Sequence, residues 1–302
     1  LRTVLRNIIF CKKDILEFNP DKIIFIDYPG FNMRIAKWSK KYKFDTIYYI
    51  APQLWAWNEK RIKEIKKYIN SLYVILPFEK EFFESRHNYP VKFLGHPLVD
   101  SINNFKTNYN SSKKLITTDK KPIIAILPGS RKQEIKKILN TVIETIEYFT
   151  EYQFIVAGAP NIELSYYTSI LKNKKIKVIE NKTYELLSVS YAAIVTSGTA
   201  TLETALFKVP QVVCYKSSYF SFIIAKLIVS IKYISLVNLI MDQEIVKELI
   251  QQDCNKDKIT IELKKVLNLD HRKSLKVKYD ELISILGDYG TSKRVAVDII
   301  KK

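Results

Sequence analysis

Two glycines that each follow an apolar run are the residues of this sequence best suited to bind a phosphate. Gly198 follows the run 191–195 and opens a segment with the pattern of a helix. Gly129 follows the run 123–127 and precedes Arg131. A glycine at a strand-to-helix junction lets a phosphate approach the free N–H groups of the helix, and a guanidinium can hold a phosphate oxygen through two hydrogen bonds. One such junction is more often an ordinary turn or N-cap, but two in one α/β half favour a diphosphate site.

Two carboxylates are candidates for roles beside that site. Glu203 lies one helical turn beyond Thr199, at a distance suited to accept hydrogen bonds from ribose hydroxyls; the alternative is that it only complements the helix dipole. Asp27 ends an expected strand and precedes the turn 28–30. It could therefore act as a general base on an acceptor hydroxyl, or simply cap the local backbone.

Composition narrows the class of protein. The chain has 302 residues, of which 47% are hydrophobic, enough for two packed domains. Cys11, Cys214 and Cys254 are an odd number without metal-ligand spacing, which favours a reducing compartment and the cytoplasm. The net charge of +18 would attract nucleic acid, anionic lipid or phosphorylated substrates, although an AT-rich genome also yields many lysines.

Several standard signatures are missing from the sequence. It contains no G-x-G-x-x-G, P-loop, H-E-x-x-H or paired C-x-x-C motif, which disfavours dinucleotide oxidoreductases, P-loop NTPases and zinc enzymes. It also lacks Asp-x-Asp, so we expect helix N-termini and Arg131 to neutralise a diphosphate without a metal ion. No apolar run spans the roughly 18 uncharged residues that a bilayer requires. The nearest, 219–236, is interrupted by Lys226 and Lys232 and fits a membrane-interface segment or a buried helix followed by a strand.

Apolar strands alternate with helical stretches along most of the chain, which predicts an α/β fold of two Rossmann-like domains with parallel sheets facing a central cleft. The expected strands are 22–27, 46–50, 72–76, 91–94, 123–127, 153–157, 176–179, 192–196 and 211–215. The chain opens inside an amphipathic pattern (Leu1, Val4, Leu5, Ile8, Ile15 and Leu16 on one face) with no preceding strand. We therefore expect an incomplete N-terminal domain.

Four segments follow from this alternation. We predict an N-terminal, acceptor-side domain over 1–100, a polar linker over 101–121, and a C-terminal, nucleotide-sugar-binding domain over 122–270. The helices of 271–302 are expected to pack back onto the N-terminal domain.

Seven segments together resemble the lipid-A-disaccharide synthase family, in order and over nearly the whole chain. They are 26–32, 49–57, 76–79, 95–98, 127–131, 197–203 and 235–239. The resemblance implies an inverting GT-B glycosyltransferase that joins UDP-2,3-diacylglucosamine to 2,3-diacylglucosamine 1-phosphate (lipid X), giving the lipid A disaccharide 1-phosphate and UDP. It implies no metal or other cofactor, a cytoplasmic protein peripheral to the inner membrane, and no nucleic-acid partner; a homodimer is compatible with it.

The same resemblance assigns roles to residues. Asp27 matches the essential acidic residue and would be the base for the acceptor's 6-hydroxyl, while Arg131 would stabilise the departing diphosphate. The positions that match the UDP-binding residues are Gly129, Ser130, Arg131, Ser197, Gly198, Thr199, Thr201, Glu203 and Asn238.

Departures from the family pattern limit what is carried over. Gly30 stands where many members have a second Asp, and Gln243 where we expect Arg. The family's N-terminal strand and Gly-Glu-x-Ser-Gly-Asp loop are absent, so the sequence resembles an N-terminally truncated member whose activity stays open. The alternatives are another GT-B UDP-sugar enzyme, such as a 2-epimerase or a transferase, and, ranked far behind, a basic nucleic-acid-binding protein without a recognition motif.

Overall fold

The computed structural model describes residues 2–108, 116–117, 119–172, 174, 176–218 and 231–301, and of residue 57 only the backbone. The chain divides into two compact units. Unit 1 contains Leu1–Pro97 and Leu286–Lys302, and unit 2 contains Leu98–Leu227 and Ile231–Ile285. Each has its own parallel sheet, so the predicted α/β class is confirmed.

Unit 1 has a four-stranded parallel sheet in the order β1-β2-β3-β4. Its strands are β1 (Lys22–Ile26), β2 (Asp45–Tyr49), β3 (Ser71–Val74) and β4 (Lys92–Phe93). Its helices are α1 (Arg2–Phe18), α2 (Pro29–Ser39), η1 (Lys40–Tyr42), α3 (Leu54–Trp57), η2 (Glu59–Arg61), α4 (Ile62–Tyr68), α5 (Pro77–Glu81), η3 (Phe82–Arg86) and α15 (Thr291–Ile300).

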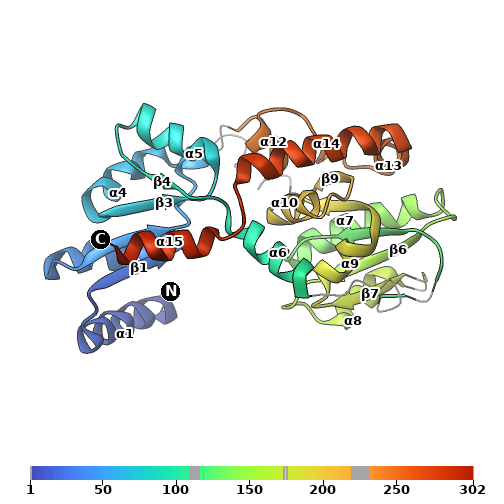
Figure 1. Ribbon diagram of the computed structural model, residues 1–302. Coiled ribbons are helices and arrows are strands. Elements are labelled where there is room, and N and C mark those ends of the chain that lie inside the picture. Colours follow the sequence, from blue (N-terminus) through green and yellow to red (C-terminus); the bar gives the residue numbers. More distant parts are fainter. Residues whose placement is uncertain are drawn as a thin grey trace. The chain divides into compact units, whose positions relative to one another are not determined.

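Helices cover both faces of this sheet. On one face, Phe25 and Tyr48 pack in a core with residues of α1, α2 and α4. On the other, Ile47 and Tyr73 pack against Val295 and Ile299 of α15, which lies across the blue strands in Figure 1. The alternation of side chains along a strand is what presents two apolar faces, as a parallel sheet requires.

The polar contacts of α15 fix its position in unit 1. The Arg294 guanidinium donates to the carbonyl of Leu94 from Nε and Nη2, at 3.2 and 3.0 Å. The Asp298 carboxylate accepts from the hydroxyl of Tyr73 at 2.5 Å and pairs with Lys92. The expectation that all of 271–302 packs on the first domain is wrong for α14 (Leu269–Leu286), which belongs to unit 2 up to residue 285 and buries Tyr279 there.

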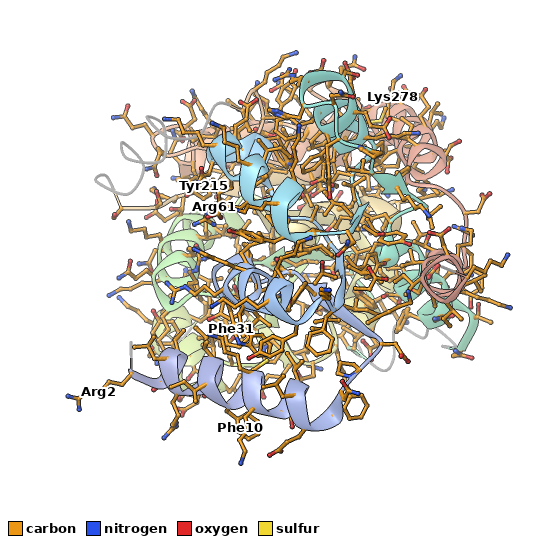
Figure 2. All side chains as sticks on the ribbon, turned by 90° about the vertical axis from the view of Figure 1, so that its left-hand side faces the viewer. Arg2, Phe10, Phe31, Arg61, Tyr215 and Lys278 are labelled. Carbon is orange, nitrogen blue, oxygen red and sulfur yellow. The ribbon has the colours of Figure 1, made fainter. Side chains whose placement is uncertain are left out.

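The first helix buries less than its sequence pattern predicts. Ile8 is buried, but Leu5 and Leu16, expected on the same face, are 49% and 43% exposed. Figure 2 shows Phe10 and Arg2 on the outer side of α1. The helix packs mainly against α2, so only a narrow stripe of its apolar residues is covered.

Unit 2 has a six-stranded parallel sheet in the order β10-β9-β8-β5-β6-β7. Its strands are β5 (Ile123–Leu127), β6 (Gln153–Gly158), β7 (Lys177–Glu180), β8 (Ser190–Thr196), β9 (Gln211–Tyr215) and β10 (Glu248–Ile250). Its helices are α6 (Pro97–Asn108), α7 (Lys132–Ile146), α8 (Leu164–Leu171), α9 (Thr183–Val189), α10 (Thr199–Leu206), α12 (Leu236–Met241), α13 (Lys256–Leu267) and α14. The predicted bounds of β5 and β9 are confirmed, and β10 was not predicted.

Two stretches of unit 2 differ from the expectation. Residues 101–108, predicted as linker, form the second part of α6, because Ile102 and Phe105 give this polar stretch an apolar side that packs on unit 2. Residues 219–230 of the candidate interface segment lie outside the described residues. Its end is described and contains no strand, since Ser235 caps the start of α12. Among the described helices, none is both long and apolar enough to traverse a bilayer.

A buried carboxylate links two loops of unit 1. Glu79 is 1% exposed and accepts hydrogen bonds from the Trp55 indole (3.0 Å) and from the backbone N–H groups of Leu76 (3.0 Å) and Ile75 (3.2 Å). Burial is the dominant influence and raises the pKa of Glu79 to about 7, although these three donors oppose the shift.

This shift predicts a pH-dependent stability. The pKa of Glu79 is about 7 in the folded chain and 4.5 ordinarily, so the folded state binds more protons between these values and loses stability as pH rises through them. Urea unfolding of the wild type should show a loss of about 3 kcal/mol from pH 4.5 to 7 that Glu79→Gln lacks. The exposed Glu81→Gln is the matched control on α5. Parallel pH curves for wild type and Glu79→Gln would contradict the assignment.

Candidate nucleotide-binding site

A pocket of about 290 Å³ lies in unit 2 at the carboxyl ends of β5, β6 and β8. It is lined by residues 127–130, 134, 157–160, 183, 196–200 and 203. The two glycine junctions singled out from the sequence thus meet in one pocket, because β5 and β8 are neighbours in the parallel sheet. Six of the nine predicted UDP-binding residues line it, namely Gly129, Ser130, Ser197, Gly198, Thr199 and Glu203.

Both junctions require glycine because of their backbone conformation. Gly129 has φ +100° and Gly198 φ +143°, conformations that other residues rarely adopt. A Cβ at Gly198 would have no heavy atom within 4 Å, so conformation rather than crowding requires glycine there. The open space above that junction leaves the backbone accessible to a ligand.

The helices that follow the junctions begin without side-chain caps. Arg131 at the N-cap of α7 and Gly198 at the N-cap of α10 make no capping hydrogen bond through a side chain. The first N–H groups of a helix have no partner within the helix, and they carry its positive dipole end. Two uncapped N-termini at one pocket give a site suited to a diphosphate.

Arg131 does not line the pocket. Its side chain is 81% exposed and its Nη1 donates to Oε1 of Glu134 at 2.9 Å. Glu134 does line the pocket, and its Oε2 would lie 3.1 Å from a Cβ at Gly129. Sequence reasoning missed Glu134, although its place three residues after Arg131 in the first turn of a helix is a signal for such a pair.

Glu203 lies at the pocket with a partner that the sequence did not reveal. The Tyr184 hydroxyl donates to its Oε1 at 3.0 Å. Burial raises the pKa of Glu203, and the hydrogen bond from Tyr184 partly offsets this rise.

A buried hydroxyl beside the junctions has no partner. Thr196, the last residue of β8 and a lining residue, is 4% exposed, and its Oγ1 makes no hydrogen bond within the described part of the chain. An unsatisfied buried hydroxyl costs free energy and is uncommon in folded proteins.

Thr201 supports the backbone of the junction, and its predicted role in binding nucleotide stays a prediction. Its side chain is fully buried and its Oγ1 donates to the carbonyl of Gly198 at 2.8 Å. The pocket is lined by its neighbours and not by Thr201. Its contribution is to hold Gly198 in place from beneath.

Asn238 is held by hydrogen bonds within the chain, and its predicted contact with nucleotide stays a prediction. Its Nδ2 donates to the carbonyl of Val246 (2.8 Å) and to Glu248 (2.9 Å), and its Oδ1 accepts from the backbone N–H groups of Ile245 and Val246. An amide side chain has two donors and two acceptor positions, so all are occupied. Asn238 is fully buried and does not line the pocket.

The same polar network reaches Ser197. Glu248 accepts from the backbone N–H groups of Ile234 and Ser235, and the Ser197 hydroxyl donates to the carbonyl of Ile234 at 2.7 Å. The segment 235–239 therefore supports the Gly198 junction from behind.

Asp27 lies in unit 1, just after β1, with an exposed side chain. It and Tyr28 both have positive φ, 46° and 42°. The Asp27 carbonyl accepts from the Tyr48 hydroxyl (2.6 Å) and from Asn32 Nδ2 (2.7 Å), which hold this strained turn.

Comparison with known proteins gives a consistent set of relatives. A family model described as lipid-A-disaccharide synthetase matches residues 1–296. A lipid-A-disaccharide synthase of Coxiella burnetii (strain Dugway 5J108-111) is 38% identical over 82% of this chain and 67% of its own length. One of Persephonella marina is 35% identical over 96% of this chain and 79% of its own length.

Solved structures show the fold. S. aureus MnaA with UDP has a TM-score of 0.72 at 15% identity, covering 98% of this chain and 79% of that one. Spinosyn rhamnosyltransferase SpnG has a TM-score of 0.63 at 8% identity, covering 98% of this chain and 78% of that one. These likenesses place the chain in the GT-B class, as predicted from the sequence.

The four side-chain hydrogen bonds of Asn238 predict that its loss would lower stability more than nucleotide affinity. Asn238→Ala removes one partner of several buried groups, so the free energy of unfolding should fall by about 3 kcal/mol in urea denaturation. The affinity of the folded variant for UDP, measured by calorimetry, should change little. Asn140→Ala, exposed on α7, is the control. Unchanged stability with weakened UDP binding would return Asn238 to the nucleotide site.

Proposed function

The chain belongs to the lipid-A-disaccharide synthetase family, and from that premise we propose that its unit-2 pocket binds the UDP group of the donor substrate. One observation carries this proposal: two uncapped helix N-termini, after Gly129 and Gly198, meet at one pocket. A pyrophosphate would accept hydrogen bonds from both sets of N–H groups.

As a member of this family, the chain is a glycosyltransferase of lipid A biosynthesis. The reaction condenses UDP-2,3-diacylglucosamine with 2,3-diacylglucosamine 1-phosphate. The acceptor's 6-oxygen forms a bond to the anomeric carbon of the donor, the bond from that carbon to the diphosphate breaks, and the hydroxyl proton passes to a base. The products are the disaccharide 1-phosphate and UDP.

The pocket residues then receive distinct roles. The backbone of the junctions at Gly129 and Gly198 would bind the diphosphate, with Ser130 and Thr199 beside it. Glu203 would accept from the ribose hydroxyls. Arg131 can turn from Glu134 toward the diphosphate, because its side chain is exposed and an exposed ion pair is weak. It would then stabilise the charge that grows on the leaving group.

Asp27 is our candidate for the general base. Its carboxylate is exposed at the end of β1, and the hydrogen bonds to its carbonyl from Tyr48 and Asn32 hold the main chain that carries it. An accessible carboxylate on a fixed main chain can take the proton of a bound hydroxyl as the new bond forms.

We propose that no metal ion takes part in binding the diphosphate. The two pocket carboxylates each have a partner in the chain, Glu134 with Arg131 and Glu203 with Tyr184. The helix N-termini and Arg131 supply the positive charge that a divalent cation would otherwise bring.

We also propose that the protein attaches peripherally to the cytoplasmic surface of the inner membrane. Its net charge is +18 and both substrates carry acyl chains. Surface cations near an anionic bilayer contribute about 1 kcal/mol each. Co-sedimentation with anionic vesicles that persists undiminished in high salt, or that neutral vesicles match, would contradict this electrostatic attachment.

The rival functions are weaker on the same observations. Solved 2-epimerases share the fold at low identity, for example 14% for the Neisseria meningitidis enzyme bound to UDP-GlcNAc, with a TM-score of 0.68 over 99% of this chain and 81% of that one. By contrast, relatives of Coxiella burnetii, Persephonella marina, Syntrophus aciditrophicus and Legionella pneumophila at 33–38% identity are named lipid-A-disaccharide synthases. Nucleic-acid binding has only the net charge in its favour.

An assay with both lipid substrates tests the function directly. With detergent-dispersed UDP-diacylglucosamine, the protein should release UDP and form disaccharide only when diacylglucosamine 1-phosphate is present. Addition of EDTA should leave the rate unchanged, since the proposal needs no divalent cation. Turnover of the UDP-sugar without acylated acceptor would contradict the function, and loss of UDP binding in EDTA would contradict metal independence.

Asp27→Asn separates catalysis from binding. The variant keeps the shape of the side chain but removes its basicity, so the disaccharide-forming rate should fall by about 10² or more. UDP affinity, measured by calorimetry, should stay near that of the wild type, because Asp27 does not line the UDP pocket. Unimpaired turnover would remove Asp27 from the mechanism.

A further inference from the structure

We propose that Tyr184 is a positioning residue that holds the Glu203 carboxylate for the ribose hydroxyls and so gives the site its preference for ribonucleotides over deoxyribonucleotides. The proposal rests on the proposed function, which places the ribose at Glu203. It adds a residue that no sequence motif indicated, and it names a selectivity that can be measured on the isolated chain.

The contact between the two side chains is direct. The Tyr184 hydroxyl donates to Oε1 of Glu203 at 3.0 Å, and Glu203 makes no other side-chain hydrogen bond within the described part of the chain. Glu203 lines the nucleotide pocket, whereas Tyr184 lines a neighbouring hollow of about 390 Å³ that shares Glu203. Tyr184 therefore approaches the carboxylate from outside the nucleotide pocket.

The tyrosine ring is itself fixed by two phenylalanines. Its centroid lies 5.5 Å from that of Phe105 on α6 and 5.4 Å from that of Phe207, and these two rings are 5.8 Å apart. Such edge-on and tilted contacts are the favoured geometry of aromatic groups. Phe207 directly follows α10, the helix that carries Glu203. The Tyr184 ring therefore packs at the end of the helix that carries the Glu203 carboxylate.

This arrangement reduces the freedom of a side chain that otherwise has several rotamers. A free glutamate loses conformational entropy when a ligand orders it, and a carboxylate already oriented by a hydrogen bond loses less. Burial raises the pKa of the Tyr184 phenol, so the hydroxyl remains a donor across ordinary pH. Burial raises the pKa of Glu203, and the hydrogen bond from Tyr184 opposes that rise and so favours the ionised form, which accepts hydrogen bonds.

Selectivity for ribose follows from the same geometry. A site built to accept a hydrogen bond from a hydroxyl rejects an analogue without it, because one acceptor position of a half-buried carboxylate is then left without a donor. An unfixed carboxylate can turn away when the hydroxyl is missing and so discriminates less. Loss of the Tyr184 hydroxyl should therefore weaken the binding of UDP more than the binding of 2′-deoxy-UDP.

Calorimetric titration of the chain with UDP and 2′-deoxy-UDP tests this directly. Tyr184→Phe keeps the ring and removes only the hydroxyl. It should raise the Kd for UDP about three- to tenfold and lower the ratio of the Kd for 2′-deoxy-UDP to the Kd for UDP. In a Glu203→Ala background the same substitution should have no further effect, since Tyr184 acts through Glu203. The control is Tyr89→Phe in unit 1, which loses a comparable hydroxyl bond to the carbonyl of Ile69 at 2.9 Å.

The outcomes separate the inference from the function on which it rests. Glu203→Ala with unchanged UDP affinity would overturn the ribose assignment itself. Weakened binding in Glu203→Ala but wild-type ratios in Tyr184→Phe would overturn only the role of Tyr184, as would equal losses for both nucleotides. Phe207→Leu provides a second variant, because it loosens the ring without touching Glu203. It should shift the ratio in the same direction by a smaller factor, and an unchanged ratio would count against the proposal.

Discussion

The parallel pairing of β5 with β8 is the constraint from which the site follows. Parallel strands carry their carboxyl ends to one edge of a sheet, so the residues after both strands meet although they are about 70 positions apart. Because Gly129 and Gly198 adopt positive φ, each strand can turn at once into a helix. Two helix N-termini thus lie at the same pocket, and their unpaired N–H groups require no side chain to bind an anion.

Much of the polar structure near the pocket serves to hold the backbone. Thr201 holds the Gly198 carbonyl, and the Ser197 hydroxyl is bonded to the carbonyl of Ile234. Glu248 and Asn238 make hydrogen bonds to the backbone of the segments just before and just after α12. A backbone site must be rigid, because its donors cannot adjust by rotating as side chains do. The buried network of hydrogen bonds gives that rigidity.

The sequence predicts strands and junctions well and side-chain roles less well. The bounds of β5 and β9 and the start of α10 follow from apolar runs and a glycine. β10 has only three residues, too few for a period to appear, and it exists because β9 offers an edge. The hydrogen bonds that Thr201 and Asn238 make to the backbone could not be predicted, since a motif does not show which groups a polar side chain faces. The hydrogen bond from Tyr184 to Glu203 joins residues 19 positions apart in the sequence, and it depends on tertiary packing.

Charge has two separate effects in this protein, a long-range effect of the net surface charge and a local effect of the groups at the pocket. The net charge of +18 is spread over the surface and is screened within about 10 Å at moderate salt, so it favours the approach of anionic lipids without fixing their geometry. At the pocket, the nearest guanidinium is exposed and paired with Glu134, and Glu203 adds a second carboxylate. In the proposed site, recognition of a diphosphate would therefore come chiefly from oriented backbone dipoles. Backbone dipoles stay in place, whereas in our proposal Arg131 would have to leave Glu134 before it could stabilise the charge of the leaving group.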